Sequence, residues 1–211
     1  NFRFILDYSD GQVANYGAHS LDMAQWGNNT ELTGPVEIQD NGSEWPTDGL
    51  FDVAKVVNFR ARYANGVELE CITRKDNVSC RFEGTEGWVE TGYGGFSTEP
   101  ASLKTSVIGR DEIHLGSSNN HIRNFIDCIR TRNEPAAPVE IGHRSATLTH
   151  LANIAFGHDS FKHLYPAIFE LGILYHHYGI GSLRHHCPCG NLDAPARIHL
   201  QRRGIAGMHF T

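Results

Sequence analysis

The stretch that decides the fold reads Val57-Asn58-Phe59-Arg60-Ala61-Arg62-Tyr63-Ala64-Asn65-Gly66-Val67-Glu68-Leu69-Glu70-Cys71. Apolar and polar side chains alternate along both of its halves, which is the pattern of strands that bury one face. The pair Asn65-Gly66 separates the halves and favours a type I′ turn, because both central residues of that turn need positive φ. The stretch therefore predicts an antiparallel hairpin.

Further strand patterns lie on both sides of this hairpin. Residues 78–82 alternate in the same way, and the turn at residues 84–87 leads into Trp88-Val89-Glu90. The first six residues are also strand-like. These short alternating runs between turn residues predict additional strands of one sheet.

Three segments have the apolar spacing of helices. One runs from about Ala18 to Gly27, and Gly27-Asn28-Asn29 is typical of a helix end. A second begins after an N-cap at Ser118 or Asn119 and ends at Asn133-Glu134-Pro135, and a third covers about 143–155. The apolar face of the second helix consists of Ile122, Phe125, Ile126 and Ile129.

Together, these strands and helices predict an α+β fold, an open and mainly antiparallel sheet with helices packed on one face. The other sheet face then meets solvent or another subunit.

Composition narrows the class of protein. The chain has 211 residues, a net charge of -6 and 40% hydrophobic residues, as expected for a globular protein. Nothing in this balance indicates a nucleic-acid partner, which would need clustered Lys and Arg. No apolar run approaches the roughly 20 residues of a membrane span, so no membrane association is expected. Because the chain begins without an initiator Met or leader, we expect a piece of a longer protein, and its compartment stays open.

The five cysteines have no disulfide-framework spacing. Cys71 and Cys80 fall on adjacent predicted strands, where pairing is conceivable. Free, half-buried thiols are the preferred interpretation, because cysteine commonly behaves as a small core residue.

Residues 157–211 differ in character from residues 1–156. This tail holds eight of the 13 histidines and has weak periodicity. We predict one organised domain over 1–156 and a divergent tail of unknown role, either an altered reading of the gene's end or an unrelated extension. The tail also contains His176-His177 and His185-His186-Cys187-Pro188-Cys189, whose side chains are of zinc-binding types. A C-x-C pair in place of the usual C-x-x-C argues against a metal site.

The strongest candidate for chemistry is Gly17-Ala18-His19-Ser20-Leu21-Asp22, with Asn15 just upstream. It places an imidazole where a Gly-containing turn becomes an amphipathic helix. Imidazole is the side chain that ordinarily titrates near neutral pH, so it suits proton transfer. A histidine that only stabilises the helix start is the competing interpretation.

These pieces, in this order, resemble the C-terminal domain of the Gfo/Idh/MocA oxidoreductases, the family of glucose-fructose oxidoreductase and inositol dehydrogenase. The likeness is greatest to the bacterial subgroup with a long inserted loop, and it covers roughly residues 1–156. It is carried by residues 7–12, 15–22, 84–88, 120–129 and 138–146.

The resemblance implies what each site residue does. His19 is the base that takes a proton from a sugar or cyclitol hydroxyl, or the group that orients that hydroxyl. Asn15 occupies the position where the family usually carries an Asp, and Asp10 stands where the subgroup usually has a second Gly. Asp22 braces the helix or the imidazole. Further substrate contacts are expected from Tyr16, His121 and Arg3.

The family enzymes hold NAD or NADP in an N-terminal Rossmann domain, and their C-terminal sheet forms the substrate-pocket wall and the oligomer interface. No G-x-G-x-x-G follows a strand in this chain, and Gly92-Tyr93-Gly94-Gly95 lacks the spacing. By itself the chain is therefore expected to bind no dinucleotide and to be inactive in the family's hydride transfer. Expected partners are a sugar-like small molecule and a second copy, docked through the open sheet face. The alternatives are a non-catalytic oligomerisation module and, third, a metal-binding tail.

Overall fold

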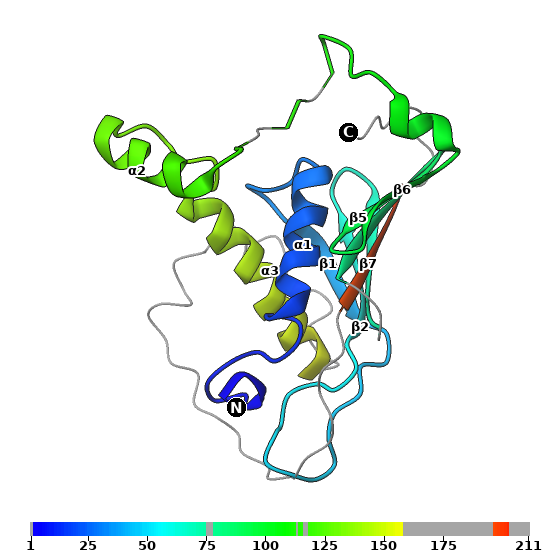
Figure 1. Ribbon diagram of the computed structural model, residues 1–211. Coiled ribbons are helices and arrows are strands. Elements are labelled where there is room, and N and C mark those ends of the chain that lie inside the picture. The colour runs from blue at the N-terminus through cyan, green and yellow to red at the C-terminus, as the bar shows by residue number, and fades with distance from the viewer. Residues whose placement is uncertain (1, 75–77, 113, 116–117, 158–195, 203–211) are drawn as a thin grey trace.

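The computed structural model describes residues 2–74, 78–112, 114–115, 118–157 and 196–202. One seven-stranded sheet runs in the order β1-β2-β3-β7-β4-β5-β6, and all neighbours are antiparallel except β4 and β7. The strands are β1 Pro35–Asp40, β2 Asn58–Tyr63, β3 Val67–Thr73, β4 Ser79–Gly84, β5 Gly87–Gly92, β6 Gly95–Glu99 and β7 Ala196–Arg202. This α+β arrangement, with an open and mainly antiparallel sheet, confirms the predicted fold class (Figure 1).

The hairpin that decides the fold is β2–β3, in which Asn58 pairs with Ile72 and Arg62 with Glu68. The predicted turn type is wrong. Of the pair Asn65-Gly66 only Gly66 has positive φ, at 83°, and the Gly66 amide donates to the Tyr63 carbonyl at 3.0 Å. This is a three-residue loop with glycine in the left-handed position, the next most common hairpin connection.

Strand β7 lies between β3 and β4, so Cys71 and Cys80 are not on adjacent strands as expected, while the preferred interpretation of free thiols is confirmed. Cys71 and Cys80 both align with Ile198, from opposite sides. Two strand spacings of about 4.8 Å separate them, more than a disulfide spans. Both are buried free thiols, and burial raises the pKa of each.

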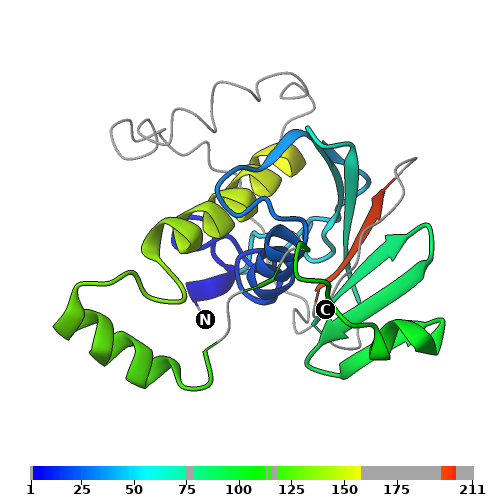
Figure 2. The same cartoon turned by 90° about the horizontal axis from the view of Figure 1, so that it is seen from above.

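Two long helices cover one face of the sheet, α1 Tyr16–Gly27 and α3 Val139–Gly157 (Figures 1 and 2). The core lies between them and the strands. It includes Leu21 and Ala24 of α1, Leu148, Leu151 and Ala152 of α3, and Phe59, Ala61 and Leu69 of the sheet. At its edge a buried hydrogen bond of 2.7 Å joins the Tyr63 hydroxyl of β2 to the Gln25 Oε1 of α1. Burial raises the pKa of Tyr63, which keeps this hydroxyl a donor.

The third helix, α2 His121–Thr131, extends away from the other elements (Figures 1 and 2). Asn120 is its N-cap and accepts the Arg123 amide at 2.9 Å, one residue beyond the predicted cap. The apolar spacing predicted the helix correctly, but its apolar side chains do not reach the sheet. Ile122 is 69% exposed and Phe125 is 62% exposed.

Two short 3-10 helices complete the described elements, η1 Phe2–Phe4 and η2 Ala101–Thr105. The strand-like interpretation of the first six residues is thus wrong for the described ones, since Phe2–Phe4 form a helical turn that buries Phe4 against Val53. The helices α1 and α3 begin earlier than predicted, at Tyr16 and Val139. In the part of the chain that the structure describes, no helix has both the length and the apolar character that crossing a bilayer requires.

Candidate functional site

The entry into α1 is set by a tight turn at residues 10–15. Gly11 has φ of 72°, and a Cβ at this position would lie 2.7 Å from the Val53 side chain. The Gly17 amide donates to the Gln12 carbonyl at 2.9 Å, so helical turns begin at once. Asn15 stands at the N-cap, but its side chain donates to Gln12 Oε1 at 3.4 Å and does not cap the helix.

His19 and Asp22 lie on one side of α1, because they are three residues apart, and Asn15 is the N-cap residue that precedes the helix. His19 and Asp22 are exposed, and Tyr16, three residues before His19, is 37% exposed. The opposite side of the helix buries Ser20, Leu21 and Gln25 in the core. The structure thus places Tyr16, His19 and Asp22 on the exposed side of α1, with the half-buried Asn15 at its N-cap.

The imidazole of His19 lies against the phenol ring of Tyr93. Their centroids are 5.7 Å apart and the rings are tilted by 53°, within the usual range for aromatic pairs. Tyr93 belongs to the tight turn between β5 and β6 and is 66% exposed. Sequence reasoning considered this Gly-Tyr-Gly-Gly segment only as a dinucleotide loop and missed the residue. An exposed aromatic flanked by glycines was the available signal.

Asp22 connects α1 to α3. Its Oδ1 accepts a hydrogen bond from the Ser145 hydroxyl at 2.6 Å, across 123 residues of sequence. Burial, and then the negative charge of Asp22, raise the pKa of Glu31. The Asp22 carboxylate and the Ser145 hydroxyl therefore meet one turn beyond His19 on the helix.

A second histidine, His150 of α3, has a carboxylate partner. Its Nδ1 contacts the carboxylate of Asp10, and Asn153 Nδ2 donates to the Asp10 carbonyl at 2.9 Å. The hydrogen bond to Asp10 raises the pKa of His150 against the opposing effect of burial. Asp10 thus ties the turn before α1 to α3. Sequence spacing contained no signal for a pair separated by 140 residues.

Two predicted substrate residues lie on other elements. His121 is the first residue of α2, and Arg3 lies in η1 with its guanidinium 5.9 Å from the Phe4 ring centroid. Within the described ranges, neither side chain has a hydrogen bond, ion pair or ring contact with His19. Both are exposed.

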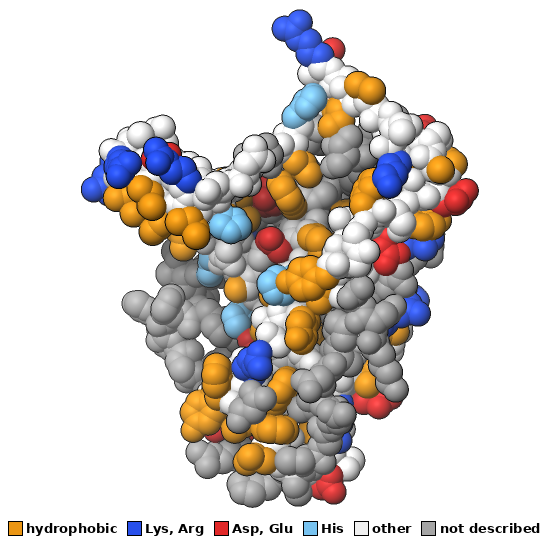
Figure 3. Space-filling model, in the orientation of Figure 1, with side chains coloured by type: hydrophobic (Ala, Val, Ile, Leu, Met, Phe, Trp, Pro, Cys, Tyr) orange, Lys and Arg blue, Asp and Glu red, His pale blue; other side chains and the backbone are white. Residues whose placement is uncertain are grey.

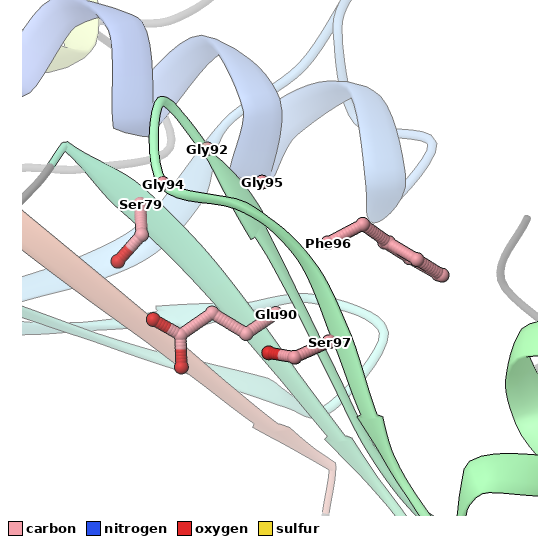
Figure 4. Close-up of a pocket in the computed structure, with 7 residues that line it drawn as sticks. All are labelled: Ser79, Glu90, Gly92, Gly94, Gly95, Phe96 and Ser97. Atoms are coloured by element: carbon pink, nitrogen blue, oxygen red, sulfur yellow. The ribbon is translucent and has the colours of Figure 1, made fainter.

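A hollow of about 180 Å³ lies beside the β5–β6 hairpin. It is lined by Ser79, Glu90, Gly92, Gly94, Gly95, Phe96 and Ser97. Figure 4 shows Ser79, Glu90 and Ser97 pointing to one side of the hairpin and Phe96 to the other. None of the predicted site residues lines it.

The described residues do not fit a dinucleotide. Gly92-Tyr93-Gly94-Gly95 closes a hairpin, with Gly92 paired to Gly95. None of α1, α2 and α3 follows a strand through a Gly-rich turn, which is the arrangement that holds a pyrophosphate. Among residues that the structure describes, no group of three His, Cys, Asp or Glu is placed to hold a metal. The His and Cys of the 176–189 stretch lie outside the described residues.

Comparison with known families gives one match. A family model described as "Oxidoreductase family, C-terminal alpha/beta domain" matches residues 1–166. No curated protein matches the chain. The boundary that we predict at residue 156 remains a prediction.

Proposed function

The chain belongs to the Gfo/Idh/MocA oxidoreductase family, as part of its C-terminal alpha/beta domain, and we propose that it forms the substrate-binding and subunit-contact portion of such an enzyme. The substrate class is a sugar or a cyclitol, and the reacting group is one of its hydroxyls. NAD or NADP, which family members commonly use, serves as the partner in hydride transfer. A non-catalytic oligomerisation module is the alternative.

The observation that carries this proposal is the exposed imidazole of His19 on α1. It stands beside Tyr16 and Asp22 on the helix surface, and among the described residues its ring contacts Tyr93 but makes no hydrogen bond that would stabilise the helix start. A hydroxyl within hydrogen-bond reach of the ring loses its proton to the imidazole as its carbon is oxidised. In the reverse direction the imidazolium returns this proton.

Asn15 acts differently from a carboxylate. Its amide cannot take a proton, so His19 alone carries the proton in this site. The Asn15 amide, anchored to Gln12, is placed one helical turn from His19 and offers both a donor and an acceptor to a substrate hydroxyl. Asp22, held by Ser145, fixes the helix that carries both residues.

The cofactor belongs to another domain in this proposal, because the described residues do not fit a dinucleotide. The chemistry supplied by a bound nicotinamide is acceptance or donation of hydride. The present residues bind and orient the hydroxyl and hold its proton.

The open face of the sheet supports subunit contact. Exposed ion pairs cross it, Arg60 with Glu70 at 3.1 Å and Arg62 with Glu37 at 2.7 Å. Nearby, the Arg81 guanidinium lies 4.1 Å from the ring centroid of Trp88. Arg and Trp are enriched in protein interfaces.

The substrate proposal is tested by NMR of the full chain with labelled histidine. We expect myo-inositol or D-glucose, added up to about 100 mM so that even a millimolar Kd is measured, to shift the His19 ring signals saturably. The signals of His114, in the loop after η2, serve as the internal control and stay unchanged. His19 signals that do not move with either polyol would contradict the proposal.

A further inference from the structure

The backbone of the β5–β6 hairpin holds Tyr93 in place. The Tyr93 amide donates to the Val78 carbonyl at 3.0 Å, which ties the turn to the start of β4. A Cβ at Gly92 would lie 2.2 Å from that same carbonyl oxygen, so only glycine permits this close approach. The turn is therefore fixed to the sheet and not free to carry its aromatic ring elsewhere.

The ring of Tyr93 remains largely uncovered in this fixed position. It is 66% exposed although it contacts His19, and its neighbours Gly92, Gly94 and Gly95 have no side chains to cover it. Figure 3 shows histidine and hydrophobic side chains adjoining on the face where α1 and the hairpin meet. A bare aromatic face next to an imidazole offers a ligand an apolar surface beside a proton carrier.

We propose that Tyr93 is a substrate-binding residue of the His19 site, whose ring packs on the C–H face of a pyranose or cyclitol while His19 meets a hydroxyl. This inference rests on the proposed function. Aromatic rings provide a large and rigid apolar surface with few rotatable bonds. The ring contact with His19 places that surface on one side of the imidazole, and Tyr16 and Asn15 lie toward the start of the helix.

The phenol hydroxyl is secondary in this proposal, because packing on a C–H face needs only the ring. Tyr93→Phe is therefore the conservative variant that keeps polyol binding, and Tyr93→Ala removes the surface. Tyr8 provides a matched control, since it is an exposed tyrosine at 72% in the loop before α1. Residue 93 is exposed, so both variants should fold, and thermal unfolding checks this.

The experiment measures the apparent Kd for myo-inositol and D-glucose from the His19 ring signals of the full chain. We expect Tyr93→Ala to weaken binding by about tenfold, while Tyr93→Phe and Tyr8→Ala remain within about twofold of wild type. Unchanged affinity in folded Tyr93→Ala overturns the role of Tyr93 and leaves the proposed function intact. If neither polyol moves the His19 signals in wild type, both the proposed function and this inference are wrong. Equal weakening in Tyr8→Ala would also overturn the inference.

Discussion

The pair His150 and Asp10 shows how two side chains hold the candidate site in place. Asp10 begins the turn that leads to Asn15 and α1, and His150 comes from α3. The hydrogen bond to Asp10 raises the pKa of His150 above its ordinary value of 6.5. The folded state therefore binds the proton of His150 more strongly than the unfolded chain does.

Because of this raised pKa, the stability that the pair contributes to the fold decreases as pH rises. The stability that the pair contributes is fully present below about pH 6.5, the pKa of an unfolded histidine, and is lost as pH rises through the raised value. We expect the difference in unfolding free energy between wild type and Asp10→Asn to be larger at pH 5.5 than at pH 8.5. Urea unfolding at both pH values measures this. His143 is an exposed histidine of the same helix, and His143→Gln is the control variant. If the difference in unfolding free energy between wild type and Asp10→Asn grew as pH rises, it would contradict a stabilising pair of Asp10 and protonated His150.

At the scale of elements, α2 is a helix that forms although its apolar side chains are not buried in the core. Its apolar residues have regular helical spacing, yet Phe125 is 62% exposed, whereas Leu148 of α3 is fully buried. Both belong to helices that sequence spacing predicts. Only Leu148 contributes to the core against the sheet.

This contrast predicts unequal effects of substitution. Phe125→Ser should change the free energy of unfolding by less than about 0.5 kcal/mol, as is usual for exposed positions. Leu148→Ala should cost about 2–5 kcal/mol, because it leaves a cavity in the core. Chemical denaturation of the full chain measures both. If Phe125→Ser lowered the free energy of unfolding by more than about 1.5 kcal/mol, α2 would have to pack against the sheet or the other helices in solution.

At the scale of the whole molecule, the described residues cover one face of the sheet and leave the other face open. The helices α1 and α3 cover the first, and ion pairs cross the second. Exposed ion pairs contribute little to the stability of a monomer. We propose that these ion pairs instead contribute to recognition between subunits.

If the open face joins two copies, charge reversal there should separate them. We expect wild type to be dimeric by gel filtration with light scattering. The double variant that combines Arg60→Glu and Arg62→Glu should be monomeric. Arg123→Glu is the matched control, since Arg123 of α2 is similarly exposed and pairs with Asp127 at 2.8 Å. A wild-type monomer, or a dimer that survives the double reversal, would contradict the proposal.

Local chemistry accounts for what sequence reasoning predicted correctly. Period-two alternation around Asn65-Gly66 predicts the β2–β3 hairpin, and i, i+3, i+4 spacing predicts all three long helices. The position of His19 at the start of α1 also follows from the sequence, and the family resemblance agrees with the matched model. These features depend on interactions within a few residues of one another, which the order of the chain contains directly.

The tertiary structure decided the rest. It places β7 between β3 and β4, so Cys71 and Cys80 stay apart. It leaves α2 exposed, brings Tyr93 against His19 and joins Asp10 to His150. Each of these depends on contacts between segments far apart in the chain, whose energies arise only when the sheet and helices pack. Periodicity shows which face of an element is apolar, but only packing decides whether another part of the molecule covers it.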